Sequence, residues 1–268
     1  LKSEKPYVYE KIMKYKEIAS ICSQECIAPD IYSMWIKTEN IAKEATAGQF
    51  VSLYGKDASR LLPRPISICE ICNDRIRIVY RVVGAGTEEI SRYVQGDEIE
   101  LLGPLGNGFS LRKENAMLIA GGIGVPPMVE LAKKLKENGT KQIISVIGYR
   151  DRNLFLKEEL EKYSTIFVAT EDGGAGTKGN VMDAIREHKL MAEVIYSCGP
   201  KPMLRAVKEF GIENEIETQI SMEERMACGI GACLGCVCQS AEVDEHSHVH
   251  NKRVCKDGPV FDAREVEL

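Results

Sequence analysis

Residues 116–139, AMLIAGGIGVPPMVELAKKLKENG, decide how the middle of the chain folds. They begin with a continuous apolar run, which is typical of a strand buried on both faces, and pass into a glycine-rich turn. From Pro126 onward the apolar residues recur at helical spacing, until Gly139 ends the pattern. The stretch therefore predicts a strand over 116–122 and a helix over 126–139, the opening unit of an α/β sheet.

The same alternation of strand and helix continues towards the C-terminus. Further strands are predicted over 142–150, 165–172 and 193–200, and further helices over 153–164 and 180–189. This order indicates a doubly wound parallel sheet, in which ligands bind beyond the carboxyl ends of the strands. Two turns leave strands at that edge, AGGIGVPPM at 120–128 and SCGPKPM at 197–203. Together they predict one crevice for a dinucleotide.

Before residue 113 the pattern changes to short strands that are rich in β-branched and aromatic residues. They are predicted over 31–39, 49–55, 75–83 and 97–104, with Gly, Pro, Asn or Asp between them. The fold class is therefore β plus α/β, with a small antiparallel barrel, a doubly wound sheet and a small C-terminal domain. We divide the chain into an extension at 1–15, a barrel at 16–112, an α/β domain at 113–220 and a C-terminal domain at 221–268.

Composition excludes several function classes. The 268 residues are 44% hydrophobic and 28% charged, as in folded domains, and a net charge of -5 offers no basic face for nucleic acid. No apolar run approaches the ~18 residues of a membrane span, and the first residues do not resemble a signal peptide. We therefore expect a cytoplasmic protein that binds neither nucleic acid nor membrane. In that reducing compartment, ten cysteines favour metal or redox chemistry over disulfides.

The cysteines of the C-terminal domain have a recognisable spacing. Cys228, Cys233 and Cys236 form C-x4-C-x2-C, which together with a fourth cysteine is the plant-type pattern of a 2Fe-2S cluster. Cys238 would point to the opposite face of an extended segment from Cys236, whereas Cys255 can return across a hairpin, so we assign Cys255 as the fourth ligand. Four thiolates also suit zinc, but a zinc ribbon needs two C-x2-C pairs and this segment has one.

The barrel carries two candidate phosphate ligands. PRPISI (63–68) places the fixed charge of Arg64 near the hydroxyl of Ser67, and VVGAGT (82–87) is a glycine-rich turn that leads into a helix. An arginine and a glycine-rich helix start that lie so close in sequence are what a pyrophosphate needs.

These motifs resemble those of the ferredoxin-reductase-like flavoproteins, which combine a flavin-binding barrel with a nicotinamide-nucleotide domain. RPIS resembles their Arg-x-x-Ser flavin motif, GAGT (84–87) their flavin pyrophosphate turn, GGIGVPPM their nucleotide loop, and CGP the motif beside the nicotinamide. The resemblance implies FAD and NAD as ligands. It implies flavin contacts for Arg64, Pro65, Ile66, Ser67, Val79, Tyr80, Arg81, Gly86 and Thr87, and nicotinamide contacts for Gly122, Gly124, Cys198, Gly199 and Pro200. Many members have an aromatic residue at the position of Ile66, so stacking on the flavin is not expected there.

The motif order and the tail ACGIGACLGCVC (227–238) with RVCKDGPVFDAREV (253–266) resemble the electron-transfer subunits of bacterial dihydroorotate dehydrogenase type B. The resemblance implies that an FMN-containing catalytic partner subunit oxidises dihydroorotate to orotate in pyrimidine biosynthesis. Electrons would then pass through the 2Fe-2S cluster and FAD to NAD⁺, in a heterotetramer of two plus two subunits. The chain itself would carry no catalytic residue for dihydroorotate. The alternative is an NAD(P)H reductase subunit of the same architecture that serves a different, ferredoxin- or sulfide-handling partner.

Other conspicuous residues receive no catalytic role. Cys69 and Cys72 are interpreted as packing in a barrel strand, Trp35 as barrel core, and His246, His248 and His250 as a solvated turn. Cys22 and Cys26 are placed beside a short strand or turn without a partner. Leu234 and Val237 are predicted to be exposed near the cluster, where a partner would dock. Arg150 and Arg152 do not decide between NAD and NADP, so NAD rests on the resemblance.

Overall fold

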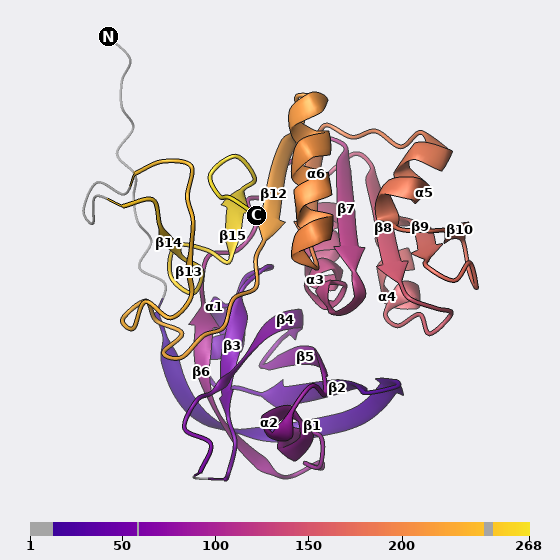
Figure 1. Cartoon of the computed structure of the whole chain (residues 1–268). Helices are drawn as coiled ribbons and strands as arrows, with labels where there is room; N and C mark the ends of the chain where they lie inside the picture. Colours follow the sequence, from indigo (N-terminus) through magenta and orange to yellow (C-terminus); the bar gives the residue numbers. More distant parts are fainter. Residues whose placement is uncertain (1–12, 58, 244–248) are drawn as a thin grey trace.

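The computed structural model describes residues 13–57, 59–243 and 249–268. Figure 1 shows a barrel, an α/β sheet beside it, and a C-terminal segment that lies against both. No helix in the described part of the chain is long and apolar enough to cross a membrane.

The barrel is closed by six antiparallel strands in the order β1-β2-β5-β4-β3-β6. Its elements are β1 (Tyr15–Ala28), β2 (Ile31–Lys37), α1 (Ile41–Glu44), β3 (Phe50–Tyr54), β4 (Arg64–Cys72), β5 (Arg75–Arg81), α2 (Ala85–Ile90) and β6 (Glu98–Leu105). The four strands predicted before residue 113 are present as β2, β3, β5 and β6. Alternate side chains such as Ile76, Ile78 and Tyr80 fill the interior.

Two predictions for the barrel were wrong. The segment with Cys22 and Cys26 is not a short strand or turn but part of the 14-residue strand β1, which pairs with both β2 and β6. Register shifts interrupt its alternation, so the period of two is not visible in the sequence. Trp35 is not core: it is half-buried on β2, and the Arg77 guanidinium lies 5.9 Å from its ring centroid.

The second sheet has seven strands in the order β10-β9-β8-β7-β11-β12-β15. Its elements are β7 (Ala116–Gly121), η1 (Gly122–Gly124), α3 (Pro126–Glu137), β8 (Ile143–Tyr149), α4 (Lys157–Glu161), β9 (Thr165–Thr170), β10 (Thr177–Lys178), α5 (Val181–His188), β11 (Val194–Cys198), α6 (Lys201–Glu213), β12 (Glu217–Ser221) and β15 (Val260–Asp262). Helices α3 and α4 pack on one face, and α5 and α6 on the other. The predicted parallel order is confirmed for β7, β8, β9 and β11.

The sequence-based interpretation omitted α6 and β12 and made α4 too long. Leu156 has a left-handed φ of 63°, and the Asn153 amide donates to the Asp151 carboxylate at 2.8 Å, so the chain turns before the helix begins. Strand β15 runs antiparallel to β12 and comes from the C-terminal segment. That segment is therefore joined to the α/β sheet by backbone hydrogen bonds.

The C-terminal segment forms the hairpin that the cysteine spacing predicts. Strands β13 (Val237–Cys238) and β14 (Lys252–Arg253) are antiparallel, with Cys238 opposite Lys252. Their neighbours enter a hydrophobic core shared with both other units. The members of this shared core include Phe50 and Leu105 of the barrel, Leu204 and Ile220 of the α/β unit, and Cys236, Val254, Cys255 and Phe261 of the segment.

A buried carboxylate fixes the barrel against the α/β unit. Glu130 of α3 is fully buried, and its Oε2 accepts a hydrogen bond from the Ile71 amide of β4 at 2.9 Å. The Lys133 ammonium lies 3.4 Å from the same oxygen and donates to the Ile71 carbonyl at 2.9 Å. Burial outweighs these partners and raises the pKa of the Glu130 carboxyl.

We expect Glu130→Ala to lower the free energy of unfolding by about 2–4 kcal/mol in urea titrations, because it leaves the Ile71 amide buried and unpaired. Glu130→Gln retains a hydrogen-bond acceptor for the Ile71 amide and should lower the free energy of unfolding by less. The control is Glu137→Ala, which removes an exposed ion pair with Lys134 and should cost less than about 1 kcal/mol.

The raised pKa of the Glu130 carboxyl also determines how the stability of the folded protein changes with pH. As pH rises above the usual carboxyl value of 4.5, the unfolded chain ionises Glu130 before the folded protein does. The parent protein should therefore lose stability relative to Glu130→Gln across that interval; a parallel pH dependence of the two proteins would contradict this.

Candidate cofactor and cluster sites

A cleft of about 720 Å³ opens at the carboxyl ends of β7, β8, β9 and β11, where the α/β unit faces the barrel. The two predicted glycine turns meet there, because Gly122, Gly124, Gly199 and Pro200 all line it. A side chain at Gly124 would overlap the Cys198 carbonyl, and one at Gly199 would lie 3.1 Å from the Gly121 nitrogen. The two turns thus pack too closely for any residue except glycine.

Cys198 ends β11 beneath this cleft. It is 1% exposed, and burial raises the pKa of its thiol far above the usual range. The protonated thiol is therefore favoured, which suits a packing or polar contact better than a nucleophile.

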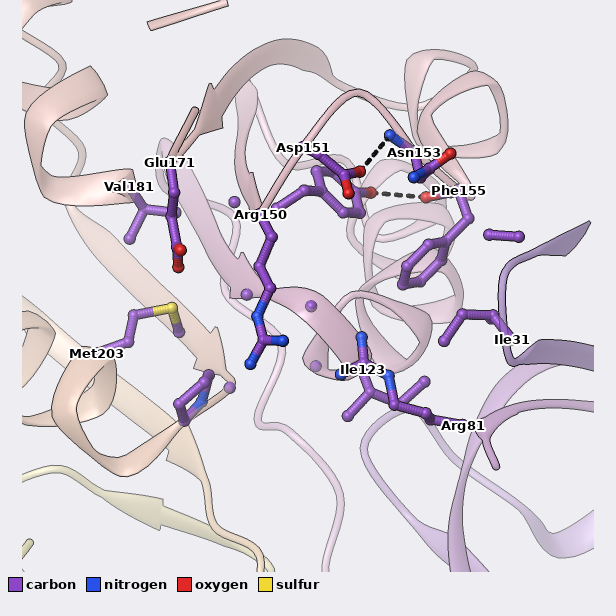
Figure 2. Close-up of a pocket in the computed structure, with 18 of the residues that line it drawn as sticks. Ile31, Arg81, Ile123, Arg150, Asp151, Asn153, Phe155, Glu171, Val181 and Met203 are labelled. Atoms are coloured by element: carbon purple, nitrogen blue, oxygen red, sulfur yellow. Dashed lines mark hydrogen bonds between the residues drawn. The ribbon is translucent and has the colours of Figure 1, made fainter. Parts of the chain in front are cut away.

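Charged side chains of both signs enter the cleft (Figure 2). Arg150 follows β8 and points into the space, and the carboxylate of Glu171, which follows β9, projects into the same region. Arg81 reaches the cleft from the barrel strand β5. Sequence reasoning missed Glu171, although its place directly after a parallel strand could have indicated it. Arg152 is not among the residues that line the cleft.

The structure brings together the two candidate phosphate ligands of the barrel. Gly86 in the first turn of α2 lies against Arg64, and a Cβ at position 86 would overlap the Arg64 guanidinium. Arg64 donates to the carbonyl oxygens of Leu62 and Pro63, so no carboxylate balances its charge in the described part of the chain. The Thr87 hydroxyl accepts from the Val83 amide at 3.0 Å and donates to the Gly84 carbonyl at 3.0 Å, which fixes the turn.

A second arginine beside this turn was missed. Arg60 donates to the Ala85 carbonyl, and its charge is shared between Asp57 at 3.0 Å and Glu89 at 3.6 Å. No motif marks it in the sequence, since two of its three partners, Ala85 and Glu89, lie in α2, some 25 residues further along the chain. Because the charge of Arg60 is already paired, Arg64 is the better candidate for binding a phosphate.

The other residues that the resemblance assigns to the flavin lie on different sides of the barrel strands. Residues 64–67 of β4 are all half-buried, but Ile66 packs against the barrel core, as its register partner Val51 does. Pro65 and Ser67 point to the outer side of the strand, which could receive a planar ligand. Val79 is buried against the α/β unit. The Tyr80 side chain fills the barrel interior and donates to Gln24 Oε1 at 2.9 Å, so it is turned away from that surface.

The four cysteines predicted as ligands lie in two pairs. The thiols of Cys228 and Cys233 are within hydrogen-bond reach of each other, and so are those of Cys236 and Cys255. In the described ranges, no three His, Cys, Asp or Glu side chains converge closely enough for one metal ion. Two pairs of thiolates fit a cluster of two irons, each with two cysteines, better than they fit a single zinc.

Backbone amides point at the sulfur atoms. Cys228 Sγ accepts from the amides of Ile230 at 3.5 Å and Ala232 at 3.3 Å, and Cys255 Sγ from the Gly231 amide at 3.1 Å. Burial opposes ionisation of Cys228, but the amides and the Cys233 thiol outweigh it and lower the pKa of Cys228 to about 6. For Cys255, burial and the neighbouring Cys236 raise the pKa to about 12. The amides around Cys228 therefore stabilise negative sulfur, which is what a metal-bound thiolate is, whereas Cys255 would lose its proton only to a bound metal.

The other cysteines and histidines lie apart from these pairs. Cys238 is buried, and its Sγ donates to the Lys252 carbonyl at 3.5 Å across the hairpin. Cys69 is fully buried within β4, and Cys72, the last residue of that strand, is exposed. His250 Nδ1 lies 3.2 Å from the Ser240 carbonyl, whereas His246 and His248 lie outside the described residues.

Two family models match the chain. The iron-sulfur cluster binding domain of dihydroorotate dehydrogenase B matches residues 223–267, and the oxidoreductase NAD-binding domain matches residues 118–209. A Bacillus velezensis protein named the electron transfer subunit of dihydroorotate dehydrogenase B (NAD(+)) is 44% identical over 258 residues, covering 93% of this chain and 98% of that protein. A Fusobacterium nucleatum protein of the same name is 43% identical over 254 residues, covering 90% and 95%.

Solved structures are similar over most of the chain or about three quarters of it. An NADH-dependent reduced ferredoxin-NADP oxidoreductase, described for flavin-based electron bifurcation, gives a TM-score of 0.84 at 28% identity and covers 94% of this chain and 90% of that chain. A ferredoxin NADP+ reductase from Neisseria gonorrhoeae with bound FAD and NADP gives 0.63 at 15% identity, covering 74% and 91%, which shows a shared fold.

The contact between Gly86 and Arg64 predicts an effect on flavin retention. Gly86→Ala should displace the Arg64 guanidinium and weaken FAD binding about tenfold or more, measured by flavin fluorescence after dilution. The matched control is Gly84→Ala in the same turn, where φ is -178° and a Cβ meets nothing within 4 Å. Equal loss of flavin in both variants would show that any added side chain in this turn weakens FAD binding, without a specific contribution from Arg64.

The cysteine pairs predict which thiols hold iron. Cys255→Ser should lose most of the iron and acid-labile sulfide per protein, because it breaks the pair with Cys236. Cys238→Ser removes only a weak hydrogen bond to Lys252 and should retain both. The reverse result in quantitative iron and sulfide assays would overturn the assignment.

Proposed function

Because the chain belongs to the family of electron transfer subunits of dihydroorotate dehydrogenase B (NAD⁺), we propose that its two cysteine pairs, its barrel and its cleft hold the groups of an electron-transfer chain that ends at NAD⁺. Both resemblances stated from the sequence are thereby confirmed at the level of family. The observation that carries the proposal is the position of the cysteine pair Cys236 and Cys255, which lies in a core shared with the barrel and the α/β unit. One chain can thus hold all three groups in contact with one framework.

The cofactors of such a subunit are an iron-sulfur cluster, FAD and NAD. When bound, FAD exchanges electrons either singly or in pairs, which connects a one-electron cluster to the two-electron nicotinamide. The residues that we propose for FAD are Arg64 and the turn of Gly86 and Thr87, which would hold the pyrophosphate. The half-buried strand with Ser67 would lie along the flavin ring. These groups bind and orient, and none of them needs to transfer a proton.

The cleft is our proposed NAD site. Gly122 and Gly124 let the nucleotide approach the start of α3, where the helix dipole favours phosphate. Pro126 and Pro127 have no N–H, and the amides of Val125 and Met128 are already paired, so the dipole and not free amides would supply the attraction. Gly199 and Pro200 form the opposite wall, above the protonated Cys198. Arg150 is placed for a phosphate or a ribose, and the carboxylate of Glu171 disfavours a further phosphate group nearby, in accord with NAD as the ligand.

A catalytic partner subunit is implied by the family, and we propose that it contains FMN and oxidises dihydroorotate to orotate. We further propose a heterotetramer of two plus two subunits. A surface beside the cysteines suits the contact: Ile230, Leu234 and Val237 are exposed by 43%, 61% and 37%. We call these three residues the cluster-side patch. Exposed apolar groups so near the cluster would let a partner approach closely.

We place the protein in the cytoplasm. All ten cysteines are free thiols, including the exposed Cys26 and Cys72, which agrees with a reducing compartment.

The test is an assay of the co-expressed complex with its dihydroorotate dehydrogenase partner. It should reduce NAD⁺ with dihydroorotate, and anaerobic NADH should bleach the flavin and cluster absorbance of the subunit. Leu234→Glu places a charge in the cluster-side patch and should weaken the complex at least tenfold by size-exclusion titration, while flavin and iron content stay unchanged.

The control for this variant is Val94→Glu, a comparably exposed apolar residue on the barrel, at 63%. It should leave the complex intact. NADH oxidation without any dihydroorotate activity would point instead to a reductase subunit that serves another partner.

A further inference from the structure

Ser52 lies in the middle of β3 with a hydroxyl that has no hydrogen-bond partner in the described part of the chain. The residue is 1% exposed. Two other buried side-chain oxygens lack a hydrogen bond, one on Glu89 and one on Glu130, but in each carboxylate the second oxygen accepts one. Ser52 alone of these three has its whole polar group unpaired. Such a group costs about 1–3 kcal/mol, so its retention here indicates a partner that the polypeptide does not supply.

The hydroxyl lies on the outer surface of the barrel. Val51 and Leu53 point into the barrel core, so Ser52 points outward with Phe50, and Phe50 packs in the shared core with Cys236 and Cys255. In register, Ser52 lies opposite Pro65 of β4, within the proposed flavin strand. It also pairs with Leu102 of β6.

The loop that carries the first two cysteines rests directly on this hydroxyl. A Cβ built on Gly229 would lie 3.0 Å from Ser52 Oγ and 3.2 Å from Leu105 Cδ1. Gly229 has a φ of +68°, so glycine is favoured there for conformation as well as for space. The loop therefore approaches β3 as closely as its backbone allows, with Cys228 as the adjacent residue.

We propose that the Ser52 hydroxyl donates a hydrogen bond to a sulfur held by the 228–233 loop, either a cysteine thiolate or a cluster sulfide, and thereby raises the reduction potential of the cluster. This rests on the proposed function, because only a loaded cluster offers negatively charged sulfur as the acceptor. The loop amides of residues 230–232 already donate to Cys228 and Cys255, and Ser52 adds a donor from the barrel. Donors to sulfur stabilise the extra negative charge of the reduced cluster.

Ser52 is then a positioning residue that tunes the cluster and is not a catalytic one. The hydroxyl lies between the proposed flavin strand and the cysteine loop, so its effect on the reduction potentials of the cluster and the flavin can be measured separately. Its removal should change the potential of the cluster and leave that of the flavin unchanged.

The experiment compares Ser52→Ala, Ser52→Val and Ser52→Thr with the parent protein in the complex with the catalytic partner. Valine and threonine have nearly the same shape, so their difference reports the hydroxyl alone. Redox titration followed by the EPR signal of the reduced cluster measures the potential, and flavin absorbance measures that of FAD. Ser145→Ala in β8 is a control, because it removes a buried hydroxyl in the other sheet.

We expect Ser52→Ala and Ser52→Val to lower the equilibrium constant for cluster reduction about three- to tenfold, tenfold being about 59 mV for one electron. Ser52→Thr and Ser145→Ala should stay within about twofold of the parent protein. If the larger side chains crowd the loop and lose iron, Ser52→Ala, which cannot crowd it, carries the comparison.

Three results would overturn the proposal. An unchanged cluster potential in Ser52→Ala at full iron content would show that the hydroxyl is not a donor. A shift confined to the flavin would assign the hydroxyl to FAD. A parent complex without any cluster signal would remove the proposed function itself, and this inference with it.

Discussion

The three units of this protein are held together by one hydrophobic core to which each of them contributes side chains. Phe50 and Leu105 come from the barrel, Leu204 and Ile220 from the α/β unit, and Cys236 and Cys255 from the C-terminal segment. The C-terminal segment is too short to bury enough apolar surface to fold alone, so it packs its apolar side chains against those of the barrel and the α/β unit. Backbone hydrogen bonds complete the attachment, since the Ala263 amide donates to the Thr218 carbonyl of β12 at 2.8 Å and the Asn107 amide to the Gly258 carbonyl at 2.6 Å. The cysteine pairs are thereby fixed relative to both larger units.

A second constraint acts on the opposite side of the barrel. Glu130 and Lys133 of α3 hold both polar groups of Ile71, and Arg77 joins Glu70 of the barrel at 2.7 Å to Glu159 of α4 at 3.3 Å. These contacts are directional, unlike the apolar core, and so they specify orientation. The cleft lies between the barrel strand that ends at Arg81 and the carboxyl edge of the sheet, so its shape depends on this orientation.

The sequence was sufficient where the signal is local. The strand, turn and helix of 116–139, the alternation of β5 and the cysteine spacing each reflect neighbours within one or two turns of chain, and each element is present. The sequence did not predict the features that depend on residues far apart in the chain. Register shifts conceal β1, Trp35 points outward because Met34 and Ile36 on either side of it fill the barrel core, and the role of Glu171 depends on which strands are adjacent. Arg60 could not be found at all, because Asp57, Ala85 and Glu89 meet it only after folding.

The same distinction explains why Ser52 has no sequence signature. A serine in the middle of an apolar barrel strand reads as an imperfection of the pattern, since FVSLY is otherwise apolar or aromatic. Only the folded chain shows that Gly229, 177 positions later, removes the side chain that would separate the loop from this hydroxyl. Two local oddities, a buried serine and a glycine in a left-handed conformation, therefore form one feature. A side chain at position 229 would meet the Ser52 hydroxyl and Leu105, so glycine at this position keeps the cysteine loop close to the barrel. The proposed donor and the loop that carries its acceptor are thus brought together by two residues that no local sequence pattern connects.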